Sequence, residues 1–130
     1  MLVRNLILGE ELPAQLRTGY EQCQCDPKWI WIVECNEKPV GILVTAPAHI
    51  AVILLRIVMV EGAPSHAAGR LLTSAFRQMN ERGYRGYMVW FGEGTHVESQ
   101  LLKMVEATGG GVLERSMALC YGLFNQQEAA

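Results

Sequence analysis

The strongest constraint on the fold is an abrupt change of hydrophobic period in the middle of the chain. Ala51 to Val60 reads AVILLRIVMV and is almost continuously apolar, which is typical of a strand covered on both faces in the middle of a sheet. From Ala67 on, apolar residues recur at spacings of three and four, which predicts an amphipathic helix ending near Gly83. The chain therefore contains a buried strand, a turn and a helix in succession.

Further elements flank this unit on both sides. Aromatic and β-branched residues predict several more strands, and Asn36 to Pro39 has the composition of a turn between two of them, which predicts an antiparallel hairpin. Thr95-x-x-Glu98 is a capping-box pattern that predicts the start of a second long helix. The predicted strands comprise residues 29–35, 40–46, 51–60, 87–91, 112–114 and 117–124, and helices are predicted over residues 12–22, from residue 67, and over residues 96–108.

This order of elements predicts a mixed α/β fold. The strand 51–60, the helix that follows it and the strand 87–91 form a β-α-β unit, which favours parallel pairing with a right-handed connection. Half of the 130 residues are hydrophobic, enough to bury a core. No internal repeat and no long linker divides the chain. One domain spanning residues 1–130 is therefore expected.

Charge and hydropathy exclude several classes of partner. The formal net charge is -2 and no run of Lys or Arg occurs, so we expect neither nucleic-acid binding nor a polybasic membrane anchor. The start MLVRNLILGEEL does not have the pattern of a signal peptide. The most apolar stretch, Ile50 to Val60, is interrupted by Arg56 and is far shorter than the roughly 20 residues that span a bilayer. A cytoplasmic location is expected.

The cysteines and histidines do not predict a metal site or a disulfide framework. The close cysteine pair is C-x-C without a second pair, and the histidines are scattered. Free or buried thiols and no bound metal are therefore expected. The residues concerned are Cys23, Cys25, Cys35, Cys120, His49, His66 and His96.

The turn between the apolar strand and the long helix is the segment best suited to chemistry. Glu61 to Arg70 reads EGAPSHAAGR, which is rich in small residues and lies at a helix start. The first N–H groups of a helix lack internal partners and can hold a phosphate or pyrophosphate. Neither the P-loop pattern nor the Rossmann glycine pattern is present. The alternative is structural: Ser65 caps the helix, and its small residues merely permit close packing.

Three stretches of the sequence, within residues 29–124, resemble the GNAT superfamily of N-acetyltransferases. WIWIVECNEKPVGILVTA is similar to the second and third strands of that family. LRIVMVEGAPSHAAGRLLTSAFRQMNERGYRGYMVWF resembles the fourth strand, the pyrophosphate loop, the third helix and the fifth strand, and HVESQLLKMVEATGG resembles the last helix. The resemblance implies a mostly antiparallel central sheet flanked by helices, with a splayed parallel pair of strands around an acetyl-CoA site.

The resemblance also implies a set of cofactor-binding residues. Main-chain groups of the fourth strand would hold the pantetheine arm, with the thioester near Ile57 to Met59, and amides of the loop and the helix start would hold the pyrophosphate. The family pattern of a basic residue or Gln followed by two small positions falls here on Pro64, Ala67 and Gly69. The implied acetyl-CoA residues are Val58, Met59, Val60, Ser65, His66, Ala67, Ala68, Gly69 and Arg70.

For catalysis, the resemblance implies that a primary amine attacks acetyl-CoA directly in a ternary complex. Such a transfer needs a general base and a proton donor for the departing thiolate. Glu61, His49 and Glu34 are candidate bases by position. The tyrosine that many family members carry four residues before the helix-terminal glycine is replaced by Val105, so Tyr121 is the candidate acid.

Three functions stay open at this point. The first is an N-acetyltransferase acting on an amine-bearing small molecule or protein. The second is a catalytically inactive GNAT-like domain that binds CoA or a protein partner, which the absent tyrosine and the divergent loop favour. The third is a structural domain without a ligand, for which edge pairing of the apolar strand MALCYGLF offers a route to a homodimer.

Overall fold

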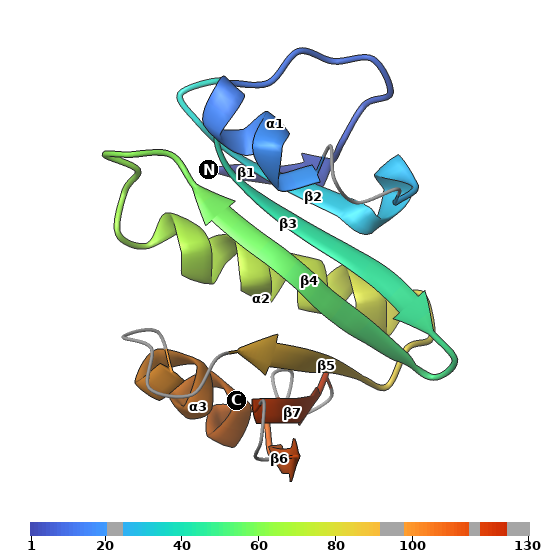
Figure 1. Cartoon of the computed structure of the whole chain (residues 1–130). Helices are drawn as coiled ribbons and strands as arrows, with labels where there is room; N and C mark the ends of the chain where they lie inside the picture. The colour runs from blue at the N-terminus through green and yellow to red at the C-terminus, as the bar shows by residue number, and fades with distance from the viewer. Residues whose placement is uncertain (21–24, 92–97, 115–117, 125–130) are drawn as a thin grey trace. The chain divides into compact units, whose positions relative to one another are not determined.

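The computed structural model of the protein describes residues 1–20, 25–91, 98–114 and 118–124 (Figure 1). Its strands follow one another in the order β1-β2-β3-β4-β5-β7-β6. No helix in the described ranges is long and apolar enough to cross a membrane. The elements are β1 (Leu2–Asn5), α1 (Ala14–Tyr20), a 3-10 turn η1 (Pro27–Trp29), β2 (Ile30–Cys35), β3 (Lys38–Ala48), β4 (Ala51–Met59), α2 (Ala67–Glu81), β5 (Gly86–Phe91), α3 (Glu98–Ala107), β6 (Gly111–Glu114) and β7 (Ala118–Leu123).

The strand pairing confirms the predicted fold class. β4 pairs with β5 in parallel, joined by α2, whereas the pairs β1–β2, β2–β3, β5–β7 and β6–β7 are antiparallel. The fold is thus a mixed, mostly antiparallel sheet with helices. Two compact units divide the chain: the first comprises residues 1–46 and 55–75, and the second comprises residues 47–54 and 76–130.

The first unit is built around aliphatic side chains on one face of β2 and β3. Ile30 and Ile32 alternate with residues of the other face, as do Ile42 and Val44, and all four are buried. Leu16 of α1 belongs to the same cluster and is fully buried. Each such side chain contributes about 1.5–3 kcal/mol by burial. Leu16 thus anchors α1, a helix of seven residues, to this cluster.

The hairpin between β2 and β3 is tighter than predicted. Asn36 and Glu37 have φ values of 53° and 64°, as the two central residues of a type I′ turn require. β3 therefore begins at Lys38 and includes Pro39, which the sequence placed in the turn. The register shifts between Val33 and Glu34, so that Val40, next to Pro39, has no partner on β2. This bulge tolerates a residue without an N–H group in the ladder.

The second unit has an aromatic core. Phe76 of α2 stacks on Tyr87 of β5 with ring centroids 4.6 Å apart, and Phe124 lies 5.3 Å from Phe76. The Tyr87 hydroxyl lies 2.7 Å from the Thr108 hydroxyl. A Cβ atom on Gly122 would lie 2.3 Å from the Tyr87 ring, so glycine is needed there to admit the ring. The long helix predicted from Ala67 is confirmed as α2.

One strand was missed and one sequence-based expectation was wrong. The chain begins with the short strand β1, which was not predicted. The expectation that residues 51–60 are covered on both faces fails in the second half of β4, because Leu55 and Ile57 are 45% and 40% exposed. An apolar run alone cannot distinguish a strand face covered by protein from one left open. The predicted capping residue Thr95 lies outside the described residues.

Candidate functional site

The candidate site lies in the first unit, where β4 runs through a loop into α2. The loop starts with a turn in which the Ala63 N–H donates to the Val60 carbonyl at 3.2 Å. Gly62, the third residue of this turn, has a φ of 80°, which glycine adopts without strain. Glu61 and Gly62 are exposed. The chain thus reverses sharply after β4 and presents the loop to solvent.

The start of α2 is formed by main-chain contacts. The Ala67 N–H donates to the Pro64 carbonyl at 3.0 Å, and the Arg70 N–H donates to the His66 carbonyl at 3.0 Å. His66 therefore occupies the N-cap position, whose carbonyl accepts the first helical bond, and the alternative in which Ser65 caps the helix is not supported. The Ala68 and Gly69 N–H groups belong to the first turn and have no carbonyl to bond within the helix. They can serve a ligand.

The small residues of this first turn differ in burial. Ala67 is fully buried, whereas Gly69 is exposed. A Cβ atom built on Gly69 would meet no atom of the described residues within 4 Å. Gly69 is not one of the glycines with a positive φ. Neither backbone conformation nor packing therefore explains a glycine at this helical position, where it costs about 1 kcal/mol relative to alanine.

The end of β4 has one edge engaged in the sheet. The Val60 N–H donates to the Val40 carbonyl at 2.9 Å, and the side chains of Val58 and Val60 pack against the core cluster that contains Ile42. Because main-chain groups alternate between the two edges of a strand, the N–H and C=O of Met59 point to the edge opposite β3. Of the three strand residues predicted to hold pantetheine, Met59 is the one so oriented.

The predicted catalytic residues are divided between the two units. Glu61 is exposed in the loop after β4, and its N–H donates to the Gln15 Oε1 of α1 at 3.2 Å. His49 belongs to the second unit, in the turn between β3 and β4, where it is exposed with a φ of 61°. Tyr121, on β7, also belongs to the second unit and is half-buried. The roles assigned to these three side chains stay predictions.

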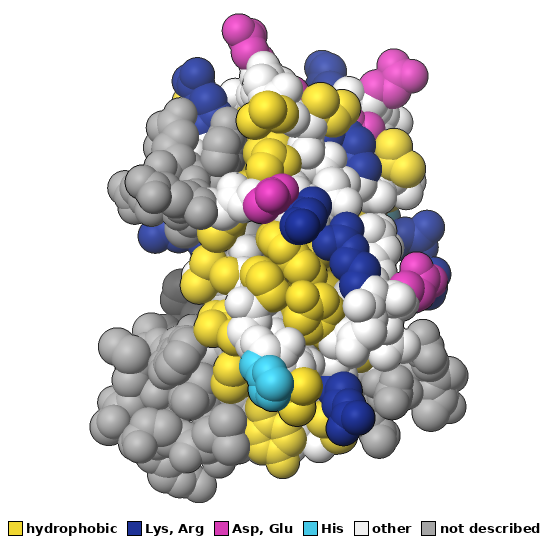
Figure 2. Space-filling view, turned by 90° about the vertical axis from the view of Figure 1, so that its right-hand side faces the viewer, with side chains coloured by type: hydrophobic (Ala, Val, Ile, Leu, Met, Phe, Trp, Pro, Cys, Tyr) yellow, Lys and Arg dark blue, Asp and Glu magenta, His cyan; other side chains and the backbone are white. Residues whose placement is uncertain are grey.

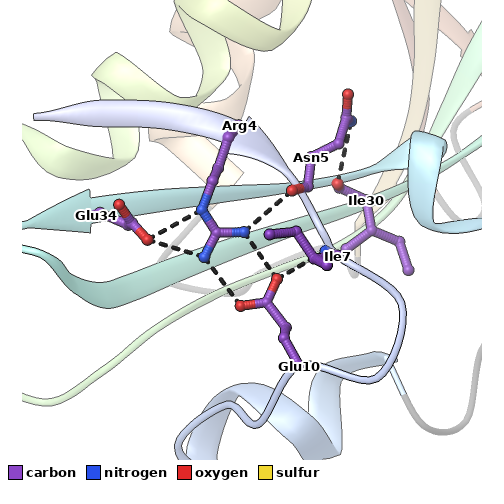
Figure 3. A network of polar contacts seen from close by, with 6 residues as sticks. All are labelled: Arg4, Asn5, Ile7, Glu10, Ile30 and Glu34. Carbon is purple, nitrogen blue, oxygen red and sulfur yellow. Dashed lines mark hydrogen bonds and ion pairs between the residues drawn. The ribbon is translucent and has the colours of Figure 1, made fainter.

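Glu34, the remaining candidate base, is held in a charged network (Figure 3). The Arg4 guanidinium lies 2.8 Å from a Glu34 oxygen and 2.7 Å from a Glu10 oxygen. Glu10 also accepts from the Ile7 N–H at 2.8 Å. The hydrogen bond from Arg4 is the main reason why the pKa of Glu10 lies below its usual value. The network ties β1 and β2 to the loop before α1, so Glu34 has a structural partner.

The geometry of the described residues does not indicate thiol or metal chemistry. Cys35 and Cys120 are free thiols, whereas Cys23 and His96 lie outside the described residues. Burial raises the pKa of the Cys120 thiol, which opposes formation of a thiolate. Within the described ranges, no three side chains of His, Cys, Asp or Glu gather closely enough to hold a metal ion.

Hydrophobic side chains reach the molecular surface. Leu55 and Ile57 of β4 are among the exposed large hydrophobic residues. The face drawn in Figure 2 shows hydrophobic side chains at the surface beside Lys and Arg side chains. The exposed part of β4 thus consists of apolar Leu55 and Ile57 with the charged Arg56 between them.

Comparison with known proteins found several solved structures that are similar to this one. No protein-family model matches the chain, and no curated protein matches it. A GNAT family acetyltransferase from Elizabethkingia anophelis with acetyl-CoA bound has a TM-score of 0.70 at 12% identity, covering 94% of this chain and 97% of that one. The IAA acetyltransferase from Bacillus cereus ATCC 14579 has a TM-score of 0.70 at 11% identity, with coverages of 94% and 98%.

A third structure is similar over a shorter stretch. The PaiA N-acetyltransferase from Thermoplasma acidophilum, in complex with coenzyme A, has a TM-score of 0.60 at 14% identity. The match covers 72% of this chain and 59% of that one. At these identities the likeness is one of fold, and it agrees with the element order and strand pairing described above. The chain has the GNAT fold, the fold of the N-acetyltransferases that the sequence resembles.

Proposed function

We propose that this protein binds acetyl-CoA and transfers its acetyl group to a primary amine on a small molecule or a protein. The observation that carries the proposal is the open first turn of α2. Gly69 there has no conformational or packing reason to be glycine, and the adjacent N–H groups lack helical partners. A pyrophosphate that approaches the main chain closely supplies the missing reason.

The surrounding groups suit the rest of such a ligand. The side chains of His66 and Arg70 are exposed beside the same turn, where the Arg70 guanidinium favours phosphate. The Met59 main chain, on the edge of β4 opposite β3, can pair with the amide groups of pantetheine as a neighbouring strand would. Two of the similar proteins were solved with acetyl-CoA or coenzyme A bound. These features support a binding site made mainly of main-chain groups.

The transfer itself requires few steps. The amine nitrogen attacks the thioester carbonyl carbon, a C–N bond forms, the C–S bond breaks, and the thiolate of CoA leaves. A base takes one proton from the amine, and the thiolate takes up a proton. Glu61 follows β4 directly and is exposed, so we assign it the role of base. Tyr121 and His49 are retained as candidates for the second proton transfer and for an alternative base.

A second function has an observation of its own. Val105 stands where the family resemblance would place a proton-donating tyrosine, and its side chain is only 1% exposed. A valine in the core donates no proton. A domain that binds CoA or a protein partner without turnover is therefore the alternative proposal.

Thermal unfolding with and without ligand tests the binding step. A ligand at about one hundred times its dissociation constant adds about 2.7 kcal/mol to the free energy of unfolding, which raises the midpoint by several degrees. We expect a concentration-dependent rise with acetyl-CoA and with CoA but not with ATP or NAD. A protein that none of these ligands stabilises refutes both proposals that involve CoA. A screen of amines for release of free CoA thiol then separates turnover from binding alone.

A further inference from the structure

We infer that Gly41 of β3 is a positioning residue for the thioester end of the acetyl-CoA site, acting through Met59. The inference rests on the proposed function, in which the Met59 main chain holds the pantetheine arm. Gly41 itself is not proposed to contact the ligand. Its part is to leave room on β3 for the side chain of the residue that does.

The space beside Gly41 is filled by two side chains. A Cβ atom built on Gly41 would lie 2.5 Å from the Met59 sulfur, 2.7 Å from the Met59 terminal methyl and 2.9 Å from a Val33 methyl. Val33 of β2 is opposite Gly41 in the strand register, and both residues are buried. The Met59 thioether therefore lies across β3, in the place that any larger residue at position 41 would take.

Backbone conformation does not explain this glycine. The described glycines with a positive φ are Gly9, Gly62, Gly83 and Gly109, and Gly41 is not among them. Glycine in a strand interior weakens the strand, because it loses more backbone freedom on folding than other residues and adds no packing. The close approach of Met59 is the reason that the structure offers.

The anchored side chain fixes the last residue of β4. A larger residue at position 41 would displace the Met59 thioether, whose bonds rotate freely, and would remove the packing that holds the end of β4 in place. Its N–H and C=O point to the edge of β4 opposite β3, because Val60 is bonded to Val40. A shift at Met59 therefore changes the groups proposed to hold the ligand near its thioester. The amides of Ala68 and Gly69, which hold the pyrophosphate, stay in place.

The test compares the affinities of CoA and acetyl-CoA by isothermal titration calorimetry in a double-mutant cycle. The proteins are the wild type, Gly41→Ala, Met59→Ala and the double variant. Gly41→Ala should lower the preference for acetyl-CoA over CoA about fivefold, or about 1 kcal/mol. In the Met59→Ala background, where no thioether needs the space, the same substitution should change that preference less than about twofold.

The outcomes test the positioning role of Gly41 separately from the proposed function. The ratio of the two affinities is the readout, because general destabilisation would weaken both ligands alike. Equal loss of both ligands in Gly41→Ala, or an unchanged ratio, overturns the positioning role while leaving the proposed function intact. If Gly41→Ala does not fold, Met59→Ala alone must lower the acetyl-CoA preference, and an unchanged ratio there overturns the inference. A wild type that binds neither ligand refutes the proposed function, and this inference falls with it.

Discussion

Gly69 offers a substitution that should change stability and ligand affinity in opposite directions. Its Cβ position is open among the described residues, it is exposed, and its φ is not positive. An alanine therefore fits the folded chain without strain. Because Gly→Ala at a compatible site reduces the entropy of the unfolded chain, Gly69→Ala should raise the free energy of unfolding by about 0.4–1 kcal/mol. The same methyl group would stand where the pyrophosphate is proposed to approach.

Two measurements on the same protein read the two effects. Urea denaturation should show the gain in stability, and the thermal midpoint should rise by about 1–4 °C. Calorimetric titration should show that CoA binds about tenfold more weakly or worse, because displacing an anion from a main-chain N–H group removes a charge-assisted hydrogen bond. Stability gained at the expense of binding is the pattern expected when a helix keeps a glycine for its ligand.

Thr73→Ala is the matched control on the same helix. Thr73 is exposed in α2 beyond the first turn, and alanine has the higher helix propensity. It should stabilise the protein by a similar amount and leave CoA affinity unchanged. A Gly69→Ala protein that binds CoA as tightly as the wild type would refute the placement of the pyrophosphate. A loss of stability in Gly69→Ala would refute the argument that the Cβ position of Gly69 is open.

Two further predictions concern pH. The pKa of Glu10 lies below its ordinary value of 4.5, mainly because of the hydrogen bond from Arg4. The ionised Glu10 carboxylate therefore stabilises the fold above this ordinary value, and the stabilisation is lost as pH falls through the folded-state pKa. Glu10→Gln should lower the free energy of unfolding near neutrality and flatten its acid limb in urea titrations; equal acid limbs would contradict this. Burial raises the pKa of Tyr87 above its ordinary value of 10. The fold therefore favours the protonated hydroxyl, and this contribution to stability is lost as pH rises through the folded-state pKa. Tyr87→Phe should cost about 1 kcal/mol and weaken the alkaline loss, and an unchanged alkaline limb would count against it.

The elements that the sequence predicted best are those whose pattern of residues lies within the element itself. α2 was predicted because Leu71, Ala75 and Met79 share one face, and all three are fully buried. Gly83, with a φ of 97°, lies just beyond the helix as predicted. β1 was missed because its residues carry no apolar alternation. It pairs with β2, and the ion pair between Arg4 and Glu34 depends on residues far apart in the chain.

The candidate site shows the same division. The loop from Glu61 to Arg70 was found because small residues before an amphipathic helix are visible in the sequence. The gap at Gly41 was not found, since its meaning depends on Met59, a residue on another strand. The hydrogen bond from the Glu61 N–H to Gln15 likewise joins residues 46 positions apart. Sequence patterns report a residue's own element, whereas these contacts are made between elements.

A binding site made of main-chain groups survives sequence change that would abolish a catalytic site. Pro64 and Ala67 stand where the family resemblance would place a basic or Gln residue and a small residue, yet the turn they form still starts α2. The free N–H groups of Ala68 and Gly69 follow from helix geometry, whatever the neighbouring side chains are. Proton transfer is less tolerant, because it needs a suitable side chain at the right place, and Val105 cannot donate the proton that a tyrosine would. Binding of CoA should therefore be the more robust of the two proposed properties, and acceptors are best sought once binding has been measured.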